Sequence, residues 1–385
     1  MKSNKLVLVS IGLLIFGAAN TLVTNVAFSM DSVGRNGVVK SMSTKCFAFW
    51  TLVMFVGMSL SIFLFIHERK TKKQSKEHIA LLSSESTESQ TNDGIELYKI
   101  APWWSIIPSA VFNLVGSCLI NVGFAIGISP SIFQFLGGSV IIFSALISII
   151  FMKKSLKGYQ WYGIGICFVG LILVALSGAL SSDSDGDDNS ISLQQQILGM
   201  SLVVLGQIAY ASQFACEEYI MAKLHASPNQ IVAFEGIYGV ILTLFILVPL
   251  FYLIPGDDNG HAEDFFETFI MIKNNWYILL PTFGFVFSIA LYNLCGQNVT
   301  SLTTCVHRTL LEALRSVVVW VVSVIEGYTI HSLAVGETLS WWSILEALGF
   351  LVLTYGTLIY NVIVKHDKLF DYSNDSPVPD VIQEE

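Results

Sequence analysis

Long apolar segments recur along the chain and are separated by shorter polar connections. Ten of these segments are close to 20 residues long, the length that an α-helix needs to cross the hydrocarbon core of a bilayer. They cover residues 6–28, 47–66, 103–127, 131–152, 159–177, 196–221, 231–254, 276–298, 303–325 and 341–364. The pattern predicts an all-α membrane protein with ten transmembrane helices.

The ten segments divide into two sets of five that share polar marks. Three positions of the first set recur 172 positions later, so that Asn121, Ser129 and Ser131 correspond to Asn293, Ser301 and Thr303. A pair of glycines spaced by seven also occurs in each set: Gly163 and Gly170 in the first, and Gly349 and Gly356 in the second. Because five is odd, the second set enters the membrane from the opposite side. Such inverted repeats are typical of alternating-access transporters, with the substrate site near the midplane.

The two sets define the expected domains. We expect a first five-helix repeat at residues 1–179, an acidic non-cytosolic loop at 180–195, a second five-helix repeat at 196–364 and a tail at 365–385. Residues 67–99 within the first repeat are polar and rich in Ser, Thr and Glu, which is typical of a disordered loop. With the N-terminus in the cytosol, fourteen Lys and Arg residues lie in cytosolic segments and four on the other side. Both termini are therefore predicted to be cytosolic.

Composition supports the membrane assignment and excludes several functions. Hydrophobic residues make up 53% of the chain and charged residues only 13%, about half the charged fraction of a soluble protein. The six cysteines show no CxxC spacing, so neither a disulfide framework nor a metal site is expected. Motifs of hydrolases, zinc proteases and nucleotide-binding loops are missing, so we expect no enzyme and no cofactor. The net charge of −9 resides mostly in loops and gives no reason to expect a nucleic-acid partner.

Charged residues inside segment 303–325 are the strongest functional signal. Arg308, Glu312 and Arg315 are spaced by four and three, so they share one helix face and the acid lies within reach of both guanidinium groups. Arg315 falls near the expected midplane, where a charge is costly unless it faces a partner or a water-filled cavity. Two interpretations stay open. Either the three charged residues form an ion cluster that fixes helix packing, or the second arginine, Arg315, binds an anionic group of the substrate.

Other polar residues are secondary candidates. His307 lies beside the charged face, and Glu217, Glu218 and Glu235 are expected within about two turns of the cytosolic interface, where carboxylates can extend to water. We assign these four to gating or coupling. Three uncharged polar residues are expected deeper in the membrane, where they line a cavity or form hydrogen bonds between helices: Asn20, Asn113 and Gln134.

Local motifs of the chain resemble those of the drug/metabolite transporter superfamily, and in particular the sixth-member branch of solute carrier family 35, subfamily F. The motifs are GxxNTL from Gly17 to Leu22, FQxLxGxVIIF from Phe133 to Phe143, the marks Glu217-Glu218 and Glu235-Gly236, and RxxxExLRxVVxW from Arg308 to Trp320. The resemblance implies ten helices in an inverted repeat and transport of a small organic anion, nucleotide-sugars being the best-known class. Vacuolar members of the superfamily suggest amino acids or peptides instead.

Two positions depart from that family pattern. Asn113 stands where the family has an aspartate, and Gly137 stands where it has an arginine. Loss of a mutually neutralising pair leaves the first repeat without a counterpart to the three charges of segment 303–325.

The alternative function is a transport-inactive membrane adaptor or receptor with the same fold.

The loop at 67–99 contains one possible sorting signal. Glu77 precedes Leu81 and Leu82 in the spacing ExxxLL, which resembles the acidic dileucine signal that clathrin adaptors read. The signal predicts a lysosomal, vacuolar or endosomal membrane, with a Golgi or mitochondrial membrane as the alternative. Expected partners are thus a small-molecule substrate, the lipid bilayer and a clathrin adaptor, and a homodimer stays open.

Overall fold

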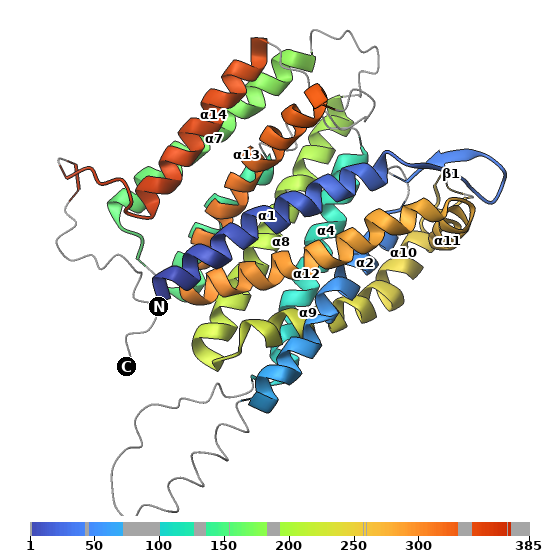
Figure 1. The fold of residues 1–385 in the computed structure, drawn as a ribbon, viewed down its shortest axis with the longest axis horizontal. Coiled ribbons are helices and arrows are strands. Elements are labelled where there is room, and N and C mark those ends of the chain that lie inside the picture. Colours follow the sequence, from blue (N-terminus) through green and yellow to red (C-terminus); the bar gives the residue numbers. More distant parts are fainter. Residues whose placement is uncertain are drawn as a thin grey trace, which may run out of the picture.

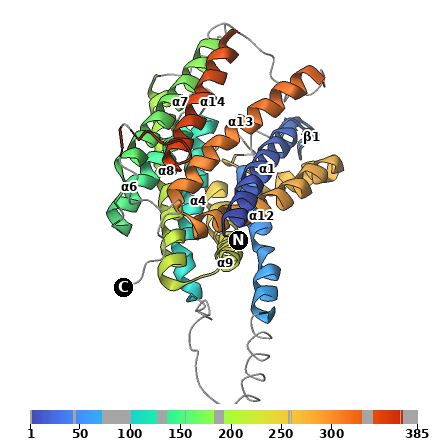
Figure 2. The same ribbon diagram turned by 60° about the vertical axis from the view of Figure 1, so that its left-hand side comes forward.

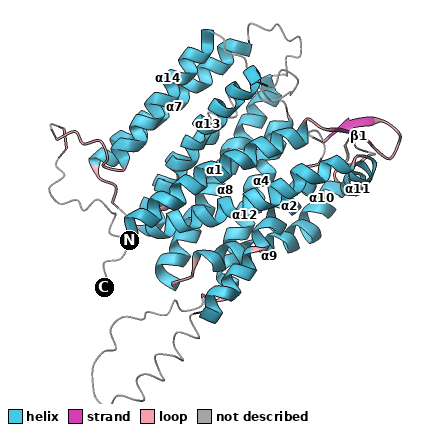
Figure 3. Ribbon diagram, viewed as in Figure 1, coloured by secondary structure: helices cyan, strands magenta, loops and turns pink. Residues whose placement is uncertain are grey.

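The computed structural model is almost entirely helical, with one small hairpin at one end (Figure 3). It describes residues 2–42, 46–71, 101–126, 136–153, 155–182, 193–256, 258, 260–329, 341–367 and 369–370. Gln134 and the ExxxLL residues Glu77, Leu81 and Leu82 lie outside these ranges, as do most of the acidic loop and of the tail.

Within the described residues, most of each predicted apolar segment is helical. In chain order the elements are α1 (Lys2–Phe28), α2 (Phe47–Ser59), η1 (Trp103–Ile106), α4 (Ile107–Ala125), α6 (Val140–Met152), α7 (Gly158–Ser182), α8 (Leu193–Leu224), α9 (Pro228–Leu242), η2 (Thr243–Leu247), α10 (Val248–Leu253), α11 (Phe265–Asn274), η3 (Trp276–Ile278), α12 (Leu279–Leu302), α13 (Cys305–Thr329) and α14 (Trp341–Tyr360).

Eight helical segments of the described chain are long and apolar enough to cross a membrane. They are Asn4–Phe28, Phe47–Thr71, Trp103–Gly123, Gly158–Ser177, Ile197–Leu224, Pro228–Leu253, Trp276–Leu302 and Trp341–Tyr360. Leu136–Met152 is apolar but shorter, and α13 is 25 residues long but interrupted by charged side chains. The chain is therefore a multi-pass membrane protein.

Local sequence signals explain where α9 begins and why it is irregular at its end. Ser227 precedes the helix and accepts a hydrogen bond from the backbone N–H of Gln230, while Pro228 occupies the first turn, where its missing N–H costs nothing. Beyond α9 the chain forms the π-helical segment η2, followed by Pro249 in the first turn of α10. Proline cannot donate in a helix interior, and a π-helical turn is one way of accommodating that loss.

A hairpin and a short helix lie at the end of the bundle where α1 meets α2. Strands β1 (Asp31–Val33) and β2 (Val39–Ser41) pair antiparallel, and β1 packs on α11 (Figure 1). Ser32 Oγ donates to the carbonyl of Met271 at 2.7 Å. Lys40 Nζ joins the hairpin to acidic residues, with contacts of 2.8 Å to Asp258 and 2.7 Å to Glu267. The sequence pattern assigned no secondary structure to these connections.

Helices from distant parts of the chain pair closely. The main pairs are α7 with α14, α4 with α8, α1 with α12 and α2 with α9, followed by α6 with α8 and α1 with α13. In two views the α7–α14 pair lies along one edge of the molecule (Figures 1 and 2).

Glycines explain how close α7 and α14 come. A Cβ built at Gly163 would lie 2.9 Å from the carbonyl oxygen of Gly356, and one built at Gly170 would lie 2.8 Å from that of Gly349. The reciprocal distances are 2.8 Å and 2.9 Å. Glycine at these four positions therefore allows the two helix backbones to pack closely.

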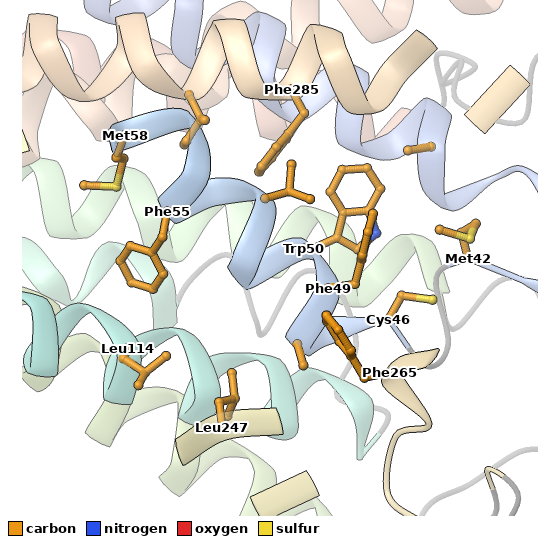
Figure 4. Close-up of a cluster of buried hydrophobic side chains, with 14 of the residues drawn as sticks. Met42, Cys46, Phe49, Trp50, Phe55, Met58, Leu114, Leu247, Phe265 and Phe285 are labelled. Carbon is orange, nitrogen blue, oxygen red and sulfur yellow. The ribbon is translucent and has the colours of Figure 1, made fainter. Parts of the chain in front are cut away.

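A large apolar cluster surrounds α2 and fixes it between α1, α9 and α12. Trp50 packs edge-on against Phe285 of α12, and Phe55 lies beside Gly239 of α9, where a Cβ would collide with its ring (Figure 4). Within a bilayer such packing gains dispersion contacts, because lipid tails are as apolar as the side chains themselves. The cluster holds the helices that form one wall of the central cavity.

Candidate functional site

A cavity of about 570 Å³ lies at the centre of the helical bundle. Helices α1, α4, α8, α12, α13 and α14 contribute side chains to its wall. Its polar lining includes Asn20, Thr21, Asn113, Gln207, Tyr210, Gln213, Tyr292, Asn293, Arg308, Thr309, Glu312, Arg315, Ser316, Ser323 and Glu346. Several predicted site residues are thus brought together here.

Arg308 forms the centre of the charged part of the wall. Its Nε donates to Glu312 at 2.9 Å, and its Nη1 donates to Glu217 of α8, also at 2.9 Å. The ring of Phe214 lies 4.2 Å from its Cζ, within cation–π distance. Only 1% of the Arg308 side chain and none of Glu217 is exposed. Water therefore scarcely screens this ion pair.

A hydrogen-bond network extends from Glu217 across α8 to α9. The Oε1 atom of Glu217 accepts from Gln213 at 2.8 Å and from Ser109 of α4 at 3.3 Å. The same Gln213 nitrogen donates to Glu235 at 2.7 Å. The two carboxylates are therefore neighbours that share one amide donor. Both are fully buried, so neither carboxylate extends to water in this structure, and the gating or coupling role assigned to them stays a prediction.

Arg315 differs from Arg308 in its partners. Its Cζ lies 5.4 Å from the ring of Tyr292 on α12, and no ion pair is formed with any described residue. The helical spacing placed Glu312 within reach of both arginines, but among the described residues Glu312 forms an ion pair only with Arg308. Within the same part of the chain, Arg315 is thus the arginine of the motif that has no carboxylate partner.

Two glycines make room for the arginines. A Cβ at Gly17 of α1 would lie 2.6 Å from Cδ of Arg315, and one at Gly296 of α12 would lie 2.9 Å from Nε of Arg308. Any larger residue at either place would push a guanidinium away from its position. Gly17 is part of the GxxNTL motif, so the motif contributes space as well as polar groups.

Glu218 and His307 lie close to the start of α13 and outside the cavity wall. Glu218 Oε2 accepts from the backbone N–H of Cys305 at 3.1 Å, which places a carboxylate on the first turn of the helix, where it is favoured. His307 Nδ1 contacts Oδ1 of Asn361, next to the end of α14. These residues fix helix ends, and the gating role assigned to them stays a prediction.

The uncharged candidates have identifiable partners. Asn113 Nδ2 donates to Glu235 Oε1 at 2.9 Å, and Asn20 Oδ1 accepts from Ser288 Oγ at 3.2 Å. Gly137 is the second departure from the family pattern. A Cβ atom built there would lie 4.0 Å from the nearest side-chain atom, which belongs to Gln207. Both departures therefore lie at the cavity, at Asn113 and Gly137.

Gln207, Gln213, Phe214 and Tyr292 are among the cavity residues that were not singled out from the sequence. Gln213 precedes Glu217 by four residues, a spacing that places the two on one helix face and would have indicated the contact. The aromatic residues carried no comparable signal, because aromatic side chains are common throughout apolar segments.

Comparisons with known proteins identify the family. The model of "Solute carrier family 35" matches residues 89–252. Solute carrier family 35 member F6 of Mus musculus is 34% identical over 262 residues, which cover 66% of this chain and 65% of that protein. The Homo sapiens protein of the same name is 32% identical, covering 66% of each chain. An uncharacterized protein of Schizosaccharomyces pombe is 31% identical and is covered to 73%.

A solved crystal structure of a protein has the same fold over nearly all of the chain. The TM-score is 0.56 with 10% sequence identity, and the match covers 96% of this chain and 99% of that one. Identity this low supports the fold alone. The match to the mouse relative spans just under two thirds of that protein's length. Through the family model and these relatives, the chain belongs to solute carrier family 35, subfamily F, and is similar to its sixth member.

Proposed function

We propose that the protein transports a small anionic organic solute across an organellar membrane by alternating access, with Arg315 as the residue that binds the anionic group. The observation that carries the proposal is the state of Arg315, which lines a cavity of about 570 Å³ and forms no ion pair with any described residue. A cavity of this size is in the range that encloses a small organic ligand.

The chemistry of Arg315 suits an anion. A guanidinium presents several donors in a rigid plane and binds carboxylate or phosphate through two parallel hydrogen bonds. Tyr292 holds the group from one side through its ring, which leaves the guanidinium edge available to a solute. Arg308 cannot serve in the same way, because Glu217 and Glu312 already accept its hydrogen bonds.

The pairing of helices supports an inverted repeat of five and five. Each helix of the first set has a counterpart in the second: α1 and α8, α2 and α9, α4 and α12, α6 and α13, α7 and α14. If each helix is replaced by its counterpart, the α4–α8 contact becomes the α12–α1 contact. In the same way, the α6–α8 contact becomes α13–α1, and the α2–α12 contact becomes α9–α4. All six contacts exist. The pairs α2–α9 and α7–α14 map onto themselves. In such an arrangement, a helix movement that opens the cavity to one side of the membrane has a symmetry-related movement that opens it to the other side.

Transport can be tested with purified protein in sealed vesicles. Uptake of radiolabelled L-glutamate, succinate and UDP-glucose would be measured, three probe anions that differ in size and in the anionic group. We expect wild type to accumulate at least one of them, and Arg315→Ala to lose that uptake by more than about tenfold, since removing a charged hydrogen-bond donor typically costs 1.5–3 kcal/mol or more.

Arg69→Ala is the matched control. Arg69 also lies over an aromatic ring, with its Cζ 5.5 Å from the ring of Phe65, but it is exposed and outside the cavity. Its replacement should leave uptake unchanged. Equal uptake by wild type and Arg315→Ala would overturn the role of Arg315. Absence of uptake of every probe by folded wild type would favour the membrane adaptor or receptor.

A further inference from the structure

Glu235 on α9 is a buried carboxylate that forms no ion pair within the described chain. One of its oxygens, Oε1, accepts hydrogen bonds from Asn113 at 2.9 Å and from Gln213 at 2.7 Å. The other oxygen, Oε2, has no hydrogen-bond partner among the described residues, and neither has the carbonyl oxygen of Gln213. An ionised carboxylate in this setting is expensive, because neither a cation nor water compensates its charge.

The ionisable groups around Glu235 do not supply that compensation. Glu217 is a second carboxylate on the same amide donor. Among the described residues, the nearby cation is Arg308, which is bound between Glu217 and Glu312. Of the helices packed on α9, α2 carries no ionisable side chain, α4 carries only Cys118, and α12 carries only Tyr292 and Cys295. Further titratable neighbours among the described residues are Cys216 of α8 and, on α9 itself, Tyr238. Two neighbouring carboxylates that cannot both remain ionised take up a proton.

The arginine contacts place that proton on Glu235. Arg308 forms ion pairs with Glu217 and Glu312. Of these three glutamates, Glu235 is the one without an arginine contact among the described residues. Glu346 on α14 also lines the cavity and is engaged in an interaction of its own.

We propose that Glu235 is a proton-binding site, and that the protein carries one proton together with each anionic solute. This inference rests on the proposed transport function. A bound anion adds one negative charge and the proton on Glu235 adds one positive charge, so loading both leaves the charge of the buried network unchanged. The proton binds at Oε2, the oxygen that is not already accepting hydrogen bonds.

The two amides connect this proton site to the cavity. Asn113 and Gln213 both line the cavity and both donate to Glu235 Oε1. A solute that accepts a hydrogen bond from either amide takes a donor from Glu235, which disfavours the ionised carboxylate further. Solute binding and proton binding therefore favour each other, as a coupled transporter requires.

The proton site can be tested without any substrate. Infrared difference spectra between acidic and alkaline buffer would be recorded for the whole protein in nanodiscs. We expect the wild-type spectrum to contain a carboxylic acid carbonyl component that is lost in alkaline buffer and is missing from the Glu235→Gln spectrum, whereas the components of the other carboxyl groups are the same in both. Glu68→Gln is the control, because Glu68 also accepts a side-chain amide hydrogen bond, from Asn229, but is not fully buried. An unchanged band in Glu235→Gln would overturn the assignment.

Coupling is tested in vesicles with the probe anion that wild type accumulates. For one proton carried per anion, with the membrane potential held at zero, the accumulation ratio should rise about tenfold for each pH unit of an inwardly directed proton gradient. Glu235→Gln should still exchange the probe across the membrane but should lose the response to the gradient, while Glu68→Gln should retain it. Full gradient response in Glu235→Gln, or a requirement for a sodium gradient instead, would overturn proton coupling. Absence of any probe movement by wild type would refute the transport function, and the infrared result would still decide the proton site.

Discussion

Arg308 of α13 and Glu217 of α8 form an ion pair, 2.9 Å between Nη1 and Oε2, that is almost completely buried and joins two helices far apart in the sequence. Both charges have been taken out of water, so the pair stabilises the fold only while both partners are present. Arg308→Ala would leave Glu217 and Glu312 without their cation. We expect it to lower the free energy of unfolding by about 3–5 kcal/mol.

The measurement is thermal unfolding of the protein in nanodiscs, with the double variant Arg308→Met/Glu217→Gln as a partial rescue. Arg35→Ala is the control, because Arg35 pairs with Asp264 at 3.3 Å but is half exposed, and such pairs contribute about 1 kcal/mol or less. Equal effects of Arg308→Ala and Arg35→Ala would contradict the special position of the buried pair.

Gly17 should control the position of Arg315 from the opposite helix. Gly17→Ala places a methyl group 2.6 Å from Arg315 Cδ and 3.0 Å from the ring of Tyr292, so both must shift. We expect uptake of the probe anion to fall while the protein remains folded. Gly284→Ala, on the same α1–α12 interface, meets only Val23 at 3.4 Å and should behave as wild type. Parallel uptake and melting curves separate a displaced guanidinium from a misfolded protein.

Where α7 and α14 come closest together, replacing glycine by any larger residue should destabilise the protein. Gly170→Ala would place Cβ 2.6 Å from the backbone nitrogen of Leu353, and backbone cannot move aside as a flexible side chain can. We expect a loss of about 1–3 kcal/mol of stability, seen as a lower melting temperature and a lower yield of folded protein. Gly165→Ala, on the same helix, has open space and should be neutral. A neutral Gly170→Ala would show that the two helices are not packed this closely.

Glu263, in the connection between α10 and α11, should make stability depend on pH. Burial raises the pKa of its carboxyl from 4.5 to about 7, although the backbone N–H groups of Ala48 and Phe49 favour the ionised form. The folded protein therefore binds a proton more tightly than the unfolded chain. The contribution of Glu263 to the stability of the folded protein is complete below about pH 4.5 and is lost as the pH rises through about 7.

Melting temperatures between pH 5 and pH 8 provide the test. Wild type should become more stable on acidification, and Glu263→Gln should show a flatter profile. Asp258 does not interfere, because hydrogen bonds from Lys40 and from the backbone of Asp264 outweigh its burial and lower its pKa below the ordinary 3.8. Identical profiles for wild type and Glu263→Gln would contradict this assignment.

The sorting motif is tested by microscopy. Replacing Leu81 and Leu82 by alanine should redirect the protein from a lysosome-like membrane to the cell surface, since the dileucine is the part of the signal that an adaptor would read. Replacement of two leucines outside the loop and away from the cavity, Leu8 and Leu205, controls for a general loss of apolar residues. If the Leu81/Leu82 variant stays with wild type, Golgi or mitochondrial residence becomes the better hypothesis.

The helices could be predicted from the sequence because span length is set by bilayer thickness and appears directly as apolar runs. The hairpin at Asp31–Ser41 could not, since each strand has only three residues and is held by its contacts with α11. The candidate site residues Arg308, Glu312 and Arg315 were recognised because charges are conspicuous in an apolar segment.

The pairing of those residues could not be predicted in the same way. Helical spacing allows Glu312 to reach either arginine, and the choice is made by tertiary neighbours: Glu217 and Phe214 hold Arg308, whereas Tyr292 lies against Arg315. Glu217 precedes Arg308 by 91 residues, and the register between two helices is not contained in the periodicity of either.

The glycine contacts between α7 and α14 also determine where the molecule can bend. Two helices whose backbones touch along two glycine pairs cannot slide past each other without collision, so they move as a single rod. Because α7 ends the first half and α14 ends the second, this rod ties the halves together along one edge. Any rocking of one half against the other would have to preserve this α7–α14 contact.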